Sequence, residues 1–136
     1  MVAEYTGIPL VRPYVDPDNQ SFWEAVKQHR LVLQRCKQCH KYFQPPRPMC
    51  PYCQSLETME WVPSSGKGII YSWCTLAYDR AAYPGIKVPY SVVLVELEEG
   101  VRLVSNVVDM KPEELYIGMP VEVVFEDVAR DLTLYK

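Results

Sequence analysis

The spacing of apolar and polar positions divides the chain into an N-terminal part with one helix and a C-terminal part made of strands. Residues 21–30 carry apolar side chains at helical spacing. Ser21-Phe-Trp-Glu24 fits a capping box, in which the serine and the glutamate bond reciprocally to the first turn. We expect Phe22 and Trp23 to cover the core, although one short helix also permits a surface that meets a partner.

Two short strands and a proline-containing arm complete the N-terminal part. The prolines of residues 1–17 predict an extended arm that packs along another surface. Residues 31–35 and 58–62 are predicted strands on either side of a cysteine-rich segment. Residues 63–68, Pro-Ser-Ser-Gly-Lys-Gly, are turn formers, and they mark the boundary between two modules.

From residue 68 onward the pattern is that of β-structure. β-Branched and aromatic residues predict five strands, at residues 69–78, 90–97, 101–108, 119–125 and 132–135. Glu98-Glu99-Gly100 predicts a short hairpin turn, because glycine readily adopts a positive φ. Residues 111–114 predict a turn or a single helical turn.

These elements predict a mainly β protein with three parts. Five strands without a long helix must protect their edges, and closure into a small barrel does so. The five-stranded barrel with a long first strand is the OB-fold, and an SH3-like barrel is the alternative. We expect an N-terminal arm and helix at residues 1–30, a zinc ribbon at residues 31–63 and an OB-fold domain at residues 64–136.

Four of the five cysteines form two C-x-x-C pairs, Cys36-Lys-Gln-Cys39 and Cys50-Pro-Tyr-Cys53. Each pair brings two thiolates to one side of a tight turn, and two facing pairs form a tetrahedron of sulfur ligands that suits zinc. Residues 40–49 are rich in proline and predict an irregular excursion between the pairs. Because four cysteine ligands leave no open coordination position, we expect a structural and not a catalytic zinc.

Three other interpretations of the cysteines remain. Disulfides need an oxidising compartment, and nothing in the sequence indicates export. Redox-active C-x-x-C pairs need a thioredoxin-like βαβ setting, and no helix is predicted after either pair. Cys36-Lys-Gln-Cys39-His40 also matches the C-x-x-C-H signature of covalent haem attachment, but haem would leave Cys50 and Cys53 unexplained.

Composition and charge narrow the classes of partner. The 136 residues are 49% hydrophobic, which is enough for a core, and the formal net charge is −3. Nucleic-acid binding usually needs clustered Lys and Arg, so single-stranded nucleic-acid binding is kept only as the alternative function. No apolar run is long enough to span a membrane, and the N-terminus lacks signal-peptide features. We therefore expect a cytoplasmic protein.

The chain offers few candidates for catalysis. Its two histidines, His29 and His40, have no carboxylate and nucleophile beside them in sequence. Cys74, which lies outside the ribbon, falls within a predicted strand, where cysteines are usually buried and inert. The sequence therefore predicts no catalytic residue, and it favours a binding or accessory role over a self-sufficient enzyme.

Short motifs, each present once, follow one another in a fixed order along nearly the whole chain. They comprise Phe22-Trp23-Glu24, Leu33-Gln-Arg-Cys36, Pro46-Arg47-Pro48 before the second cysteine pair, Glu60-Trp61, Ser65-Gly66-Lys-Gly68, Pro89-Tyr90, Val95-Glu96-Leu97-Glu98-Glu99-Gly100 and Ile117-Gly118-Met-Pro-Val121. With the two cysteine pairs, this series resembles the zinc-ribbon OB-fold proteins of acyl-CoA metabolism, long catalogued as domain of unknown function 35. One departure is His40, where many members have glycine; it affects the knuckle turn and not the ligation.

This resemblance implies an accessory role. Members are small subunits, or fused tail domains, that accompany thiolase-like enzymes and acyl-CoA hydratases, and the family has no agreed catalytic residues to carry over. We expect two copies of this chain on a thiolase-type dimer, as a heterotetramer. Aldol cleavage of a steroid-derived acyl-CoA is the preferred reaction and Claisen-type thiolysis is the second, both performed by the partner's residues.

A CoA contact within a shared site is a further expectation. CoA carries phosphates and a pantetheine arm. The loop cations Arg80 and Lys87 can meet the phosphates, beside Tyr83 and Tyr90. The alternative is that both cations are simply solvated.

Overall fold

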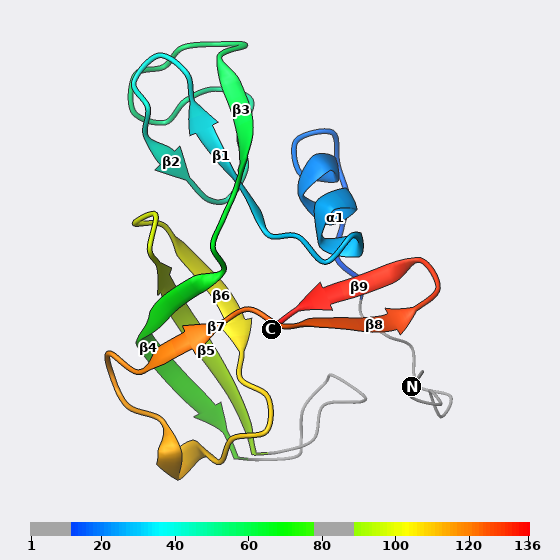
Figure 1. The fold of residues 1–136 in the computed structure, drawn as a ribbon, viewed down its shortest axis with the longest axis vertical. Helices are drawn as coiled ribbons and strands as arrows, with labels where there is room; N and C mark the ends of the chain where they lie inside the picture. Colours follow the sequence, from blue (N-terminus) through cyan, green and yellow to red (C-terminus); the bar gives the residue numbers. More distant parts are fainter. Residues whose placement is uncertain (1–11, 78–88) are drawn as a thin grey trace.

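The structure is a computed structural model, and it describes residues 12–77 and 89–136. Within them lie the helix α1 (Gln20–Lys27) and the 3-10 turn η1 (Pro112–Glu114) (Figure 1). The strands are β1 (Val32–Cys36), β2 (Tyr42–Phe43), β3 (Met59–Pro63), β4 (Lys67–Leu76), β5 (Tyr90–Leu97), β6 (Arg102–Asn106), β7 (Pro120–Glu122), β8 (Phe125–Ala129) and β9 (Leu132–Tyr135).

Helix α1 begins one residue before the predicted capping box. Asn19 is its N-cap residue, and the backbone N–H of Asn19 donates to the Asp16 carboxylate at 2.9 Å. The backbone N–H of Asp16 donates in turn to the side-chain oxygen of Asn19 at 2.9 Å. Ser21 therefore lies inside the first turn, and Glu24 accepts a hydrogen bond from Gln20. The predicted Ser21–Glu24 capping box was wrong, because the N-cap residue is Asn19 and Ser21 already lies within the helix.

The end of α1 is also earlier than predicted. The chain passes through a left-handed residue, His29, with φ 56°, and the backbone N–H of His29 donates to the Val26 carbonyl at 2.9 Å. The helix thus stops at Lys27 and not near Arg30. Phe22 and Val26 are buried, as expected of a core-facing surface. Among the described residues no helix is long and apolar enough to cross a membrane.

Strands β2, β1 and β3 form an antiparallel sheet with β1 at its centre. Strand β1 pairs with β3 over its whole length, from Val32 opposite Pro63 to Cys36 opposite Met59. Strand β2 was not predicted, because two residues are too few to show an alternating pattern. It pairs with β1 through Gln34 opposite Phe43 and Arg35 opposite Tyr42.

A curled four-stranded sheet, in the order β6-β5-β4-β7, forms the OB-fold part. Strand β5 has the predicted bounds, and β4 begins two residues before its predicted start. A bulge between Ile70 and Ser72 interrupts the pairing of β4 with β5, and such bulges bend a strand. Gly100 closes the β5–β6 hairpin with φ 85°, as predicted from the turn sequence.

The strand predicted at residues 119–125 is two strands. Strand β7 pairs with β4, whereas β8 pairs with β9. The backbone N–H of Val123 still donates to the Gly66 carbonyl at 2.8 Å, but Val124 exchanges two backbone hydrogen bonds of 2.8 Å with Lys136. The chain changes its pairing partner between Val123 and Val124, and alternation of apolar residues cannot reveal such a change.

One main apolar core joins the helix, the ribbon sheet and the curled sheet. Helix α1 lies beside β1 and the β8–β9 hairpin (Figure 1). Its buried side chains pack with those of β1, β5 and β6; the core includes Phe22, Val26, Leu33, Leu97 and Leu103. The residues of this core come from both sides of positions 30 and 63, at which the sequence predicts domain boundaries.

Two smaller clusters complete the burial. One lies inside the curled sheet and consists of Ile70, Val93 and Leu115. The other lies in the ribbon and consists of Cys36, Phe43 and Cys50. The ribbon therefore has little apolar core of its own.

Candidate metal centre and the other predicted site residues

Two cysteine turns of matching geometry hold the four sulfur atoms. In the first, the backbone N–H of His40 donates to the Cys36 carbonyl at 2.8 Å, and in the second, that of Gln54 donates to the Cys50 carbonyl at 3.0 Å. His40 and Gln54 both have left-handed backbones, with φ values of 61° and 62°. Glycine adopts this conformation most readily. The first knuckle nevertheless forms the same turn as the second, although His40 stands where many family members have glycine.

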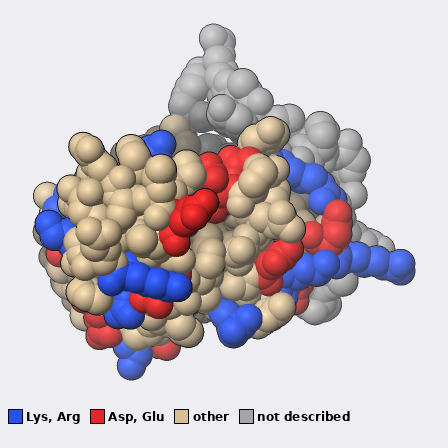
Figure 2. Space-filling view, turned by 90° about the horizontal axis from the view of Figure 1, so that it is seen from above, with Lys and Arg blue, Asp and Glu red and all other residues tan. Residues whose placement is uncertain are grey.

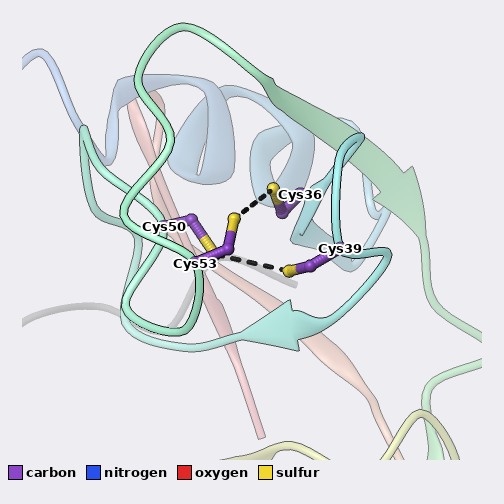
Figure 3. Close-up of side chains that lie close together, drawn as sticks. All are labelled: Cys36, Cys39, Cys50 and Cys53. Carbon is purple, nitrogen blue, oxygen red and sulfur yellow. Dashed lines mark hydrogen bonds between the residues drawn. The ribbon is translucent and has the colours of Figure 1, made fainter.

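The four cysteine sulfur atoms all lie within 4.8 Å of one another. Cys36 Sγ is 3.7 Å from Cys53 Sγ, and Cys39 Sγ is 3.6 Å from Cys50 Sγ (Figure 3). Tetrahedral zinc with sulfur ligands at about 2.3 Å places these atoms about 3.8 Å apart, whereas a disulfide needs about 2.0 Å. The spacing is that of a tetrahedral four-sulfur site, and the described cysteines form no disulfide.

Hydroxyl groups of Ser55 and Thr58 approach the sulfur atoms. Ser55 Oγ lies 3.2 Å from Cys36 Sγ and 3.1 Å from Cys53 Sγ, and Thr58 Oγ1 lies 3.4 Å from Cys36 Sγ. Hydrogen bonds from Ser55 first, and then from Thr58, lower the pKa of Cys36 to about 5. The Ser55 hydroxyl also lowers the pKa of Cys53. These hydroxyls therefore favour the thiolate form, which is the form that binds metal.

Cys39 shows why the cluster suits a cation. A hydrogen bond from the Lys41 backbone lowers the pKa of the Cys39 thiol, but burial and the three neighbouring thiols together raise it to about 11. Thiolates confined this closely repel one another, and a bound dication removes that repulsion. The donor set and its spacing thus fit a zinc ion with all four positions taken by cysteine.

Known proteins match both halves of this arrangement. The family model described as the ChsH2 rubredoxin-like zinc ribbon domain matches residues 23–58, and that of the ChsH2 C-terminal OB-fold domain matches residues 61–126. A DUF35 domain-containing scaffold protein from Methanocaldococcus jannaschii is 36% identical over 80% of this chain and 77% of its own length. The chain belongs to the ChsH2 (DUF35) family.

Other members of the family carry names of enzyme subunits. A probable enoyl-CoA hydratase alpha subunit from Thermomonospora curvata is 42% identical over 90% of this chain, which spans only 38% of that relative's length. A 3-oxo-4,17-pregnadiene-20-carboxyl-CoA hydratase alpha subunit from Mycobacterium tuberculosis is 35% identical over 93% of this chain and 39% of its own length. A solved structure described as the Ltp2-ChsH2(DUF35) aldolase matches with a TM-score of 0.83 at 41% identity, over 91% of this chain and 95% of the matched chain.

Only one of the four predicted CoA-binding residues lies within the described part of the chain. Arg80, Tyr83 and Lys87 lie outside the described residues. Tyr90 is the first residue of β5, pairs with Leu76 and is partly buried. The CoA site of this family member therefore stays a prediction.

Cys74 is exposed, not buried as expected. The reason is the bulge in β4. Ile70 faces the interior, and without the bulge the even-numbered residues after it would do so too. The bulge reverses the alternation, so that Trp73 packs against the inner cluster and Cys74 faces outward, opposite Val92.

His29 makes a contact that the sequence did not indicate. Its Nε2 lies 3.0 and 3.1 Å from the two carboxylate oxygens of Asp127, and its ring stacks on Phe125 with centroids 5.4 Å apart. Thr133 donates to Asp127 at 2.5 Å. The Thr133 hydrogen bond and then the His29 contact lower the pKa of Asp127. This network ties the end of α1 to the β8–β9 hairpin.

Proposed function

We propose that this chain is a non-catalytic accessory subunit that binds and supports a thiolase-like acyl-CoA enzyme. The observation that carries the proposal is the likeness to a chain of the Ltp2-ChsH2(DUF35) aldolase structure, at 41% identity and a TM-score of 0.83. The match covers 95% of that chain. It therefore includes the ribbon, the helix and the curled sheet together, and not a lone zinc ribbon.

The described side chains support a binding role. The four ribbon cysteines are turned toward one another, and His29 is held by Asp127 and Phe125. Within residues 12–77 and 89–136 no hydrogen bond joins a histidine to a serine, threonine or cysteine side chain. A nucleophile with a neighbouring histidine base is thus not found in the part of the chain that the structure describes.

Charge supports a protein partner over nucleic acid. On the face shown in Figure 2, Lys and Arg are interspersed with Asp and Glu and do not form one basic surface. Arg12, Arg35, Arg102 and Lys136 each pair with a carboxylate. Cations that are already paired contribute less to phosphate contact, which depends on several clustered cations.

Exposed apolar side chains supply surface for the partner. We define the outer face as the side of β4, β5 and β6 that points away from the interior of the curled sheet. It carries Tyr71, Leu76 and Val104, whose side chains are exposed. Tyr14, at 83% exposed, lies apart from this face, beside α1 and β9, and adds an exposed aromatic side chain there. Aromatic residues of this kind are enriched in protein interfaces.

The partner's residues would perform the reaction. Aldol cleavage of a steroid-derived acyl-CoA is the preferred reaction, because one structural relative is described as an aldolase and one sequence relative is named for a pregnadiene carboxyl-CoA substrate. Claisen-type thiolysis is second. Two copies of this chain on a thiolase-type dimer would form a heterotetramer.

In this role, the zinc would be structural, and CoA would bind in a site shared by this chain and its partner. One zinc per chain, held by Cys36, Cys39, Cys50 and Cys53, would fix the two knuckles. The loop with Arg80, Tyr83 and Lys87, together with Tyr90, would contact CoA. If the double variant Arg80→Ala, Lys87→Ala leaves the acyl-CoA affinity of the assembled enzyme unchanged, this CoA contact is refuted.

Co-expression with a candidate thiolase-like partner tests the main proposal. We expect the two proteins to co-elute in size-exclusion chromatography, and the chain to raise the activity or solubility of its partner. Val104→Asp, on the outer face, is expected to weaken co-elution, while Leu56→Asp is the matched control, because Leu56 is equally exposed but lies on the ribbon. A chain that neither co-elutes nor changes the activity of its partner would refute the proposal.

A further inference from the structure

A cavity of about 230 Å³ lies inside the OB-fold part, away from the metal centre and from the outer face. It is bordered by the inner side of β5 and β6, by β7, and by the segments that join β6 to β7 and β7 to β8, and it opens to solvent on one side. Leu31, Gly66, Tyr135 and Lys136 also line it. Its walls are almost entirely aliphatic; they include Val93, Val95, Leu103, Val107, Met119 and Val121. Neither the predicted zinc site nor the predicted CoA contact uses any of these residues.

Four polar side chains border the aliphatic wall, namely Ser105, Asn106, Glu122 and Lys136. Of these, Ser105 is the one that carries a buried hydroxyl without a partner among the described residues. Ser105 pairs with Val93, two positions after Leu103 on β6, and therefore points to the same inner side. Ser105 is among the residues that line the cavity, and its hydroxyl oxygen is buried and has no hydrogen-bond partner among the residues that the structure describes. A buried hydroxyl without a partner is unfavourable. A ligand with a hydrogen-bonding group would supply that partner.

The size and polarity of the cavity define a class of ligand. Apolar cavities stay dry and take apolar guests, and one of about 150 Å³ holds benzene, so this larger one suits a molecule of about eight carbons. We propose that the cavity binds a small aliphatic molecule with one carbonyl or hydroxyl group, which hydrogen-bonds to Ser105. This site goes beyond the accessory role and does not depend on it.

The entrance favours a small flexible molecule over a side chain of a partner protein. The inner walls are almost inaccessible, with Val93 at 2% and Leu103 at 6% exposed. The hydroxyl of Tyr135, which also lines the cavity, donates to the Val104 carbonyl at 3.1 Å and so connects β9 to β6. Of the lining residues, Val108 and Val124 have exposed side chains, and a thin flexible chain can enter beside them.

The test is titration of the zinc-loaded, isotope-labelled full chain with 2-octanone, followed by two-dimensional NMR. We expect saturable shifts in β5, β6 and β7. Val121→Phe, which fills the cavity, should weaken binding at least tenfold. Leu56→Phe, an exposed residue on the ribbon, is the matched control and should leave binding unchanged.

Ser105→Ala keeps the test informative if Val121→Phe does not fold. Loss of one hydrogen bond should weaken 2-octanone about three- to tenfold, and it should leave 1-octene, which has no oxygen, unaffected. No saturable binding, shifts confined to the outer face, or equal 2-octanone affinity in Ser105→Ala and the native chain would overturn the proposal. So would loss of 2-octanone binding in the co-purified complex, because the cavity would then belong to the subunit interface. Co-elution with the partner is measured separately, so failure of one proposal does not imply failure of the other.

Discussion

The zinc ribbon and the curled sheet reach a fixed structure by different means. The ribbon buries a cluster of only Cys36, Phe43 and Cys50, whereas the curled sheet has its own inner cluster and also contributes to the main core. Ligation can replace burial where the chain is too short to form a core. The sheet, in contrast, is stabilised by apolar burial and by strand pairing.

Strand β1 belongs to both regions. Its last residue, Cys36, is in the sulfur cluster, and Leu33, with no exposed surface, is in the main core. When the metal is lost, unfolding can therefore stay within the knuckles or spread through β1 to the curled sheet.

The largest effect is expected from Cys50→Ser. Cys50 is fully buried among the ligands, and structural zinc in small modules contributes on the order of 10 kcal/mol to folding. We expect loss of zinc by elemental analysis and loss of NMR dispersion in residues 36–58. Cys74→Ser is the matched control, since Cys74 is exposed and outside the cluster. Full zinc content in Cys50→Ser would contradict the assignment, and loss of the curled-sheet signals as well would show that the two regions fold as one unit.

Leu33→Ala tests whether β1 couples the ribbon to the curled sheet, by a change in the main core and not in the sulfur cluster. Removing this buried side chain should lower the free energy of unfolding by about 2–5 kcal/mol, because Leu33 packs in the main core with residues of α1, β5 and β6. Zinc content should not change. Urea denaturation checks the effect, with the exposed Leu56→Ala as control. An equal loss in both variants would show that β1 does not carry the connection.

The sequence predicts the two regions unequally well, for a physical reason. Cysteine spacing defines the sulfur cluster locally, and the alternation over β5 and the turn at Gly100 are local signals too. The exposure of Cys74 follows from a bulge, and the change of partner after Val123 depends on Gly66 and Lys136, which are far away in the sequence. Neither leaves a pattern in a single stretch of sequence.

The same distinction holds for the candidate sites. The metal cluster could be predicted, because its ligands come in two short motifs. The His29–Asp127 contact joins residues 98 positions apart, and the cavity is formed by several separate strands and loops. Its one sequence signal is Ser105, a polar residue at an inward-facing position, which becomes informative only when the register of β6 is known.

Gly68→Ala tests the tight pairing within the curled sheet. A Cβ at Gly68 would lie 2.4 Å from the Glu96 carbonyl oxygen and 2.9 Å from a Val95 methyl carbon. Because backbone must move to relieve this contact, we expect a loss of about 1–3 kcal/mol and faster hydrogen exchange in β5. Gly100→Ala is the comparison: its Cβ would meet nothing within 4 Å, and only its φ of 85° is strained. Unchanged exchange at Glu96 and Leu97 in Gly68→Ala would refute the steric account.

The smallest effect concerns Asp127, which joins α1 to the hairpin. Thr133→Val removes the hydrogen bond that does most to lower the pKa of Asp127, so this pKa should rise toward its ordinary value of 3.8. A carboxyl whose pKa is lowered by folding stabilises the fold above its unfolded pKa, and that contribution is lost as the pH falls through the folded pKa. The stability difference between the native chain and Thr133→Val should therefore be present at neutral pH and vanish at acid pH. Carbon-detected NMR titration of the Asp127 carboxyl measures the shift, and Thr133→Ser, which keeps the hydroxyl, should titrate like the native chain. If Thr133→Val also titrates like the native chain, the Thr133 hydroxyl does not lower the pKa of Asp127, and the main cause must be sought in the His29 contact.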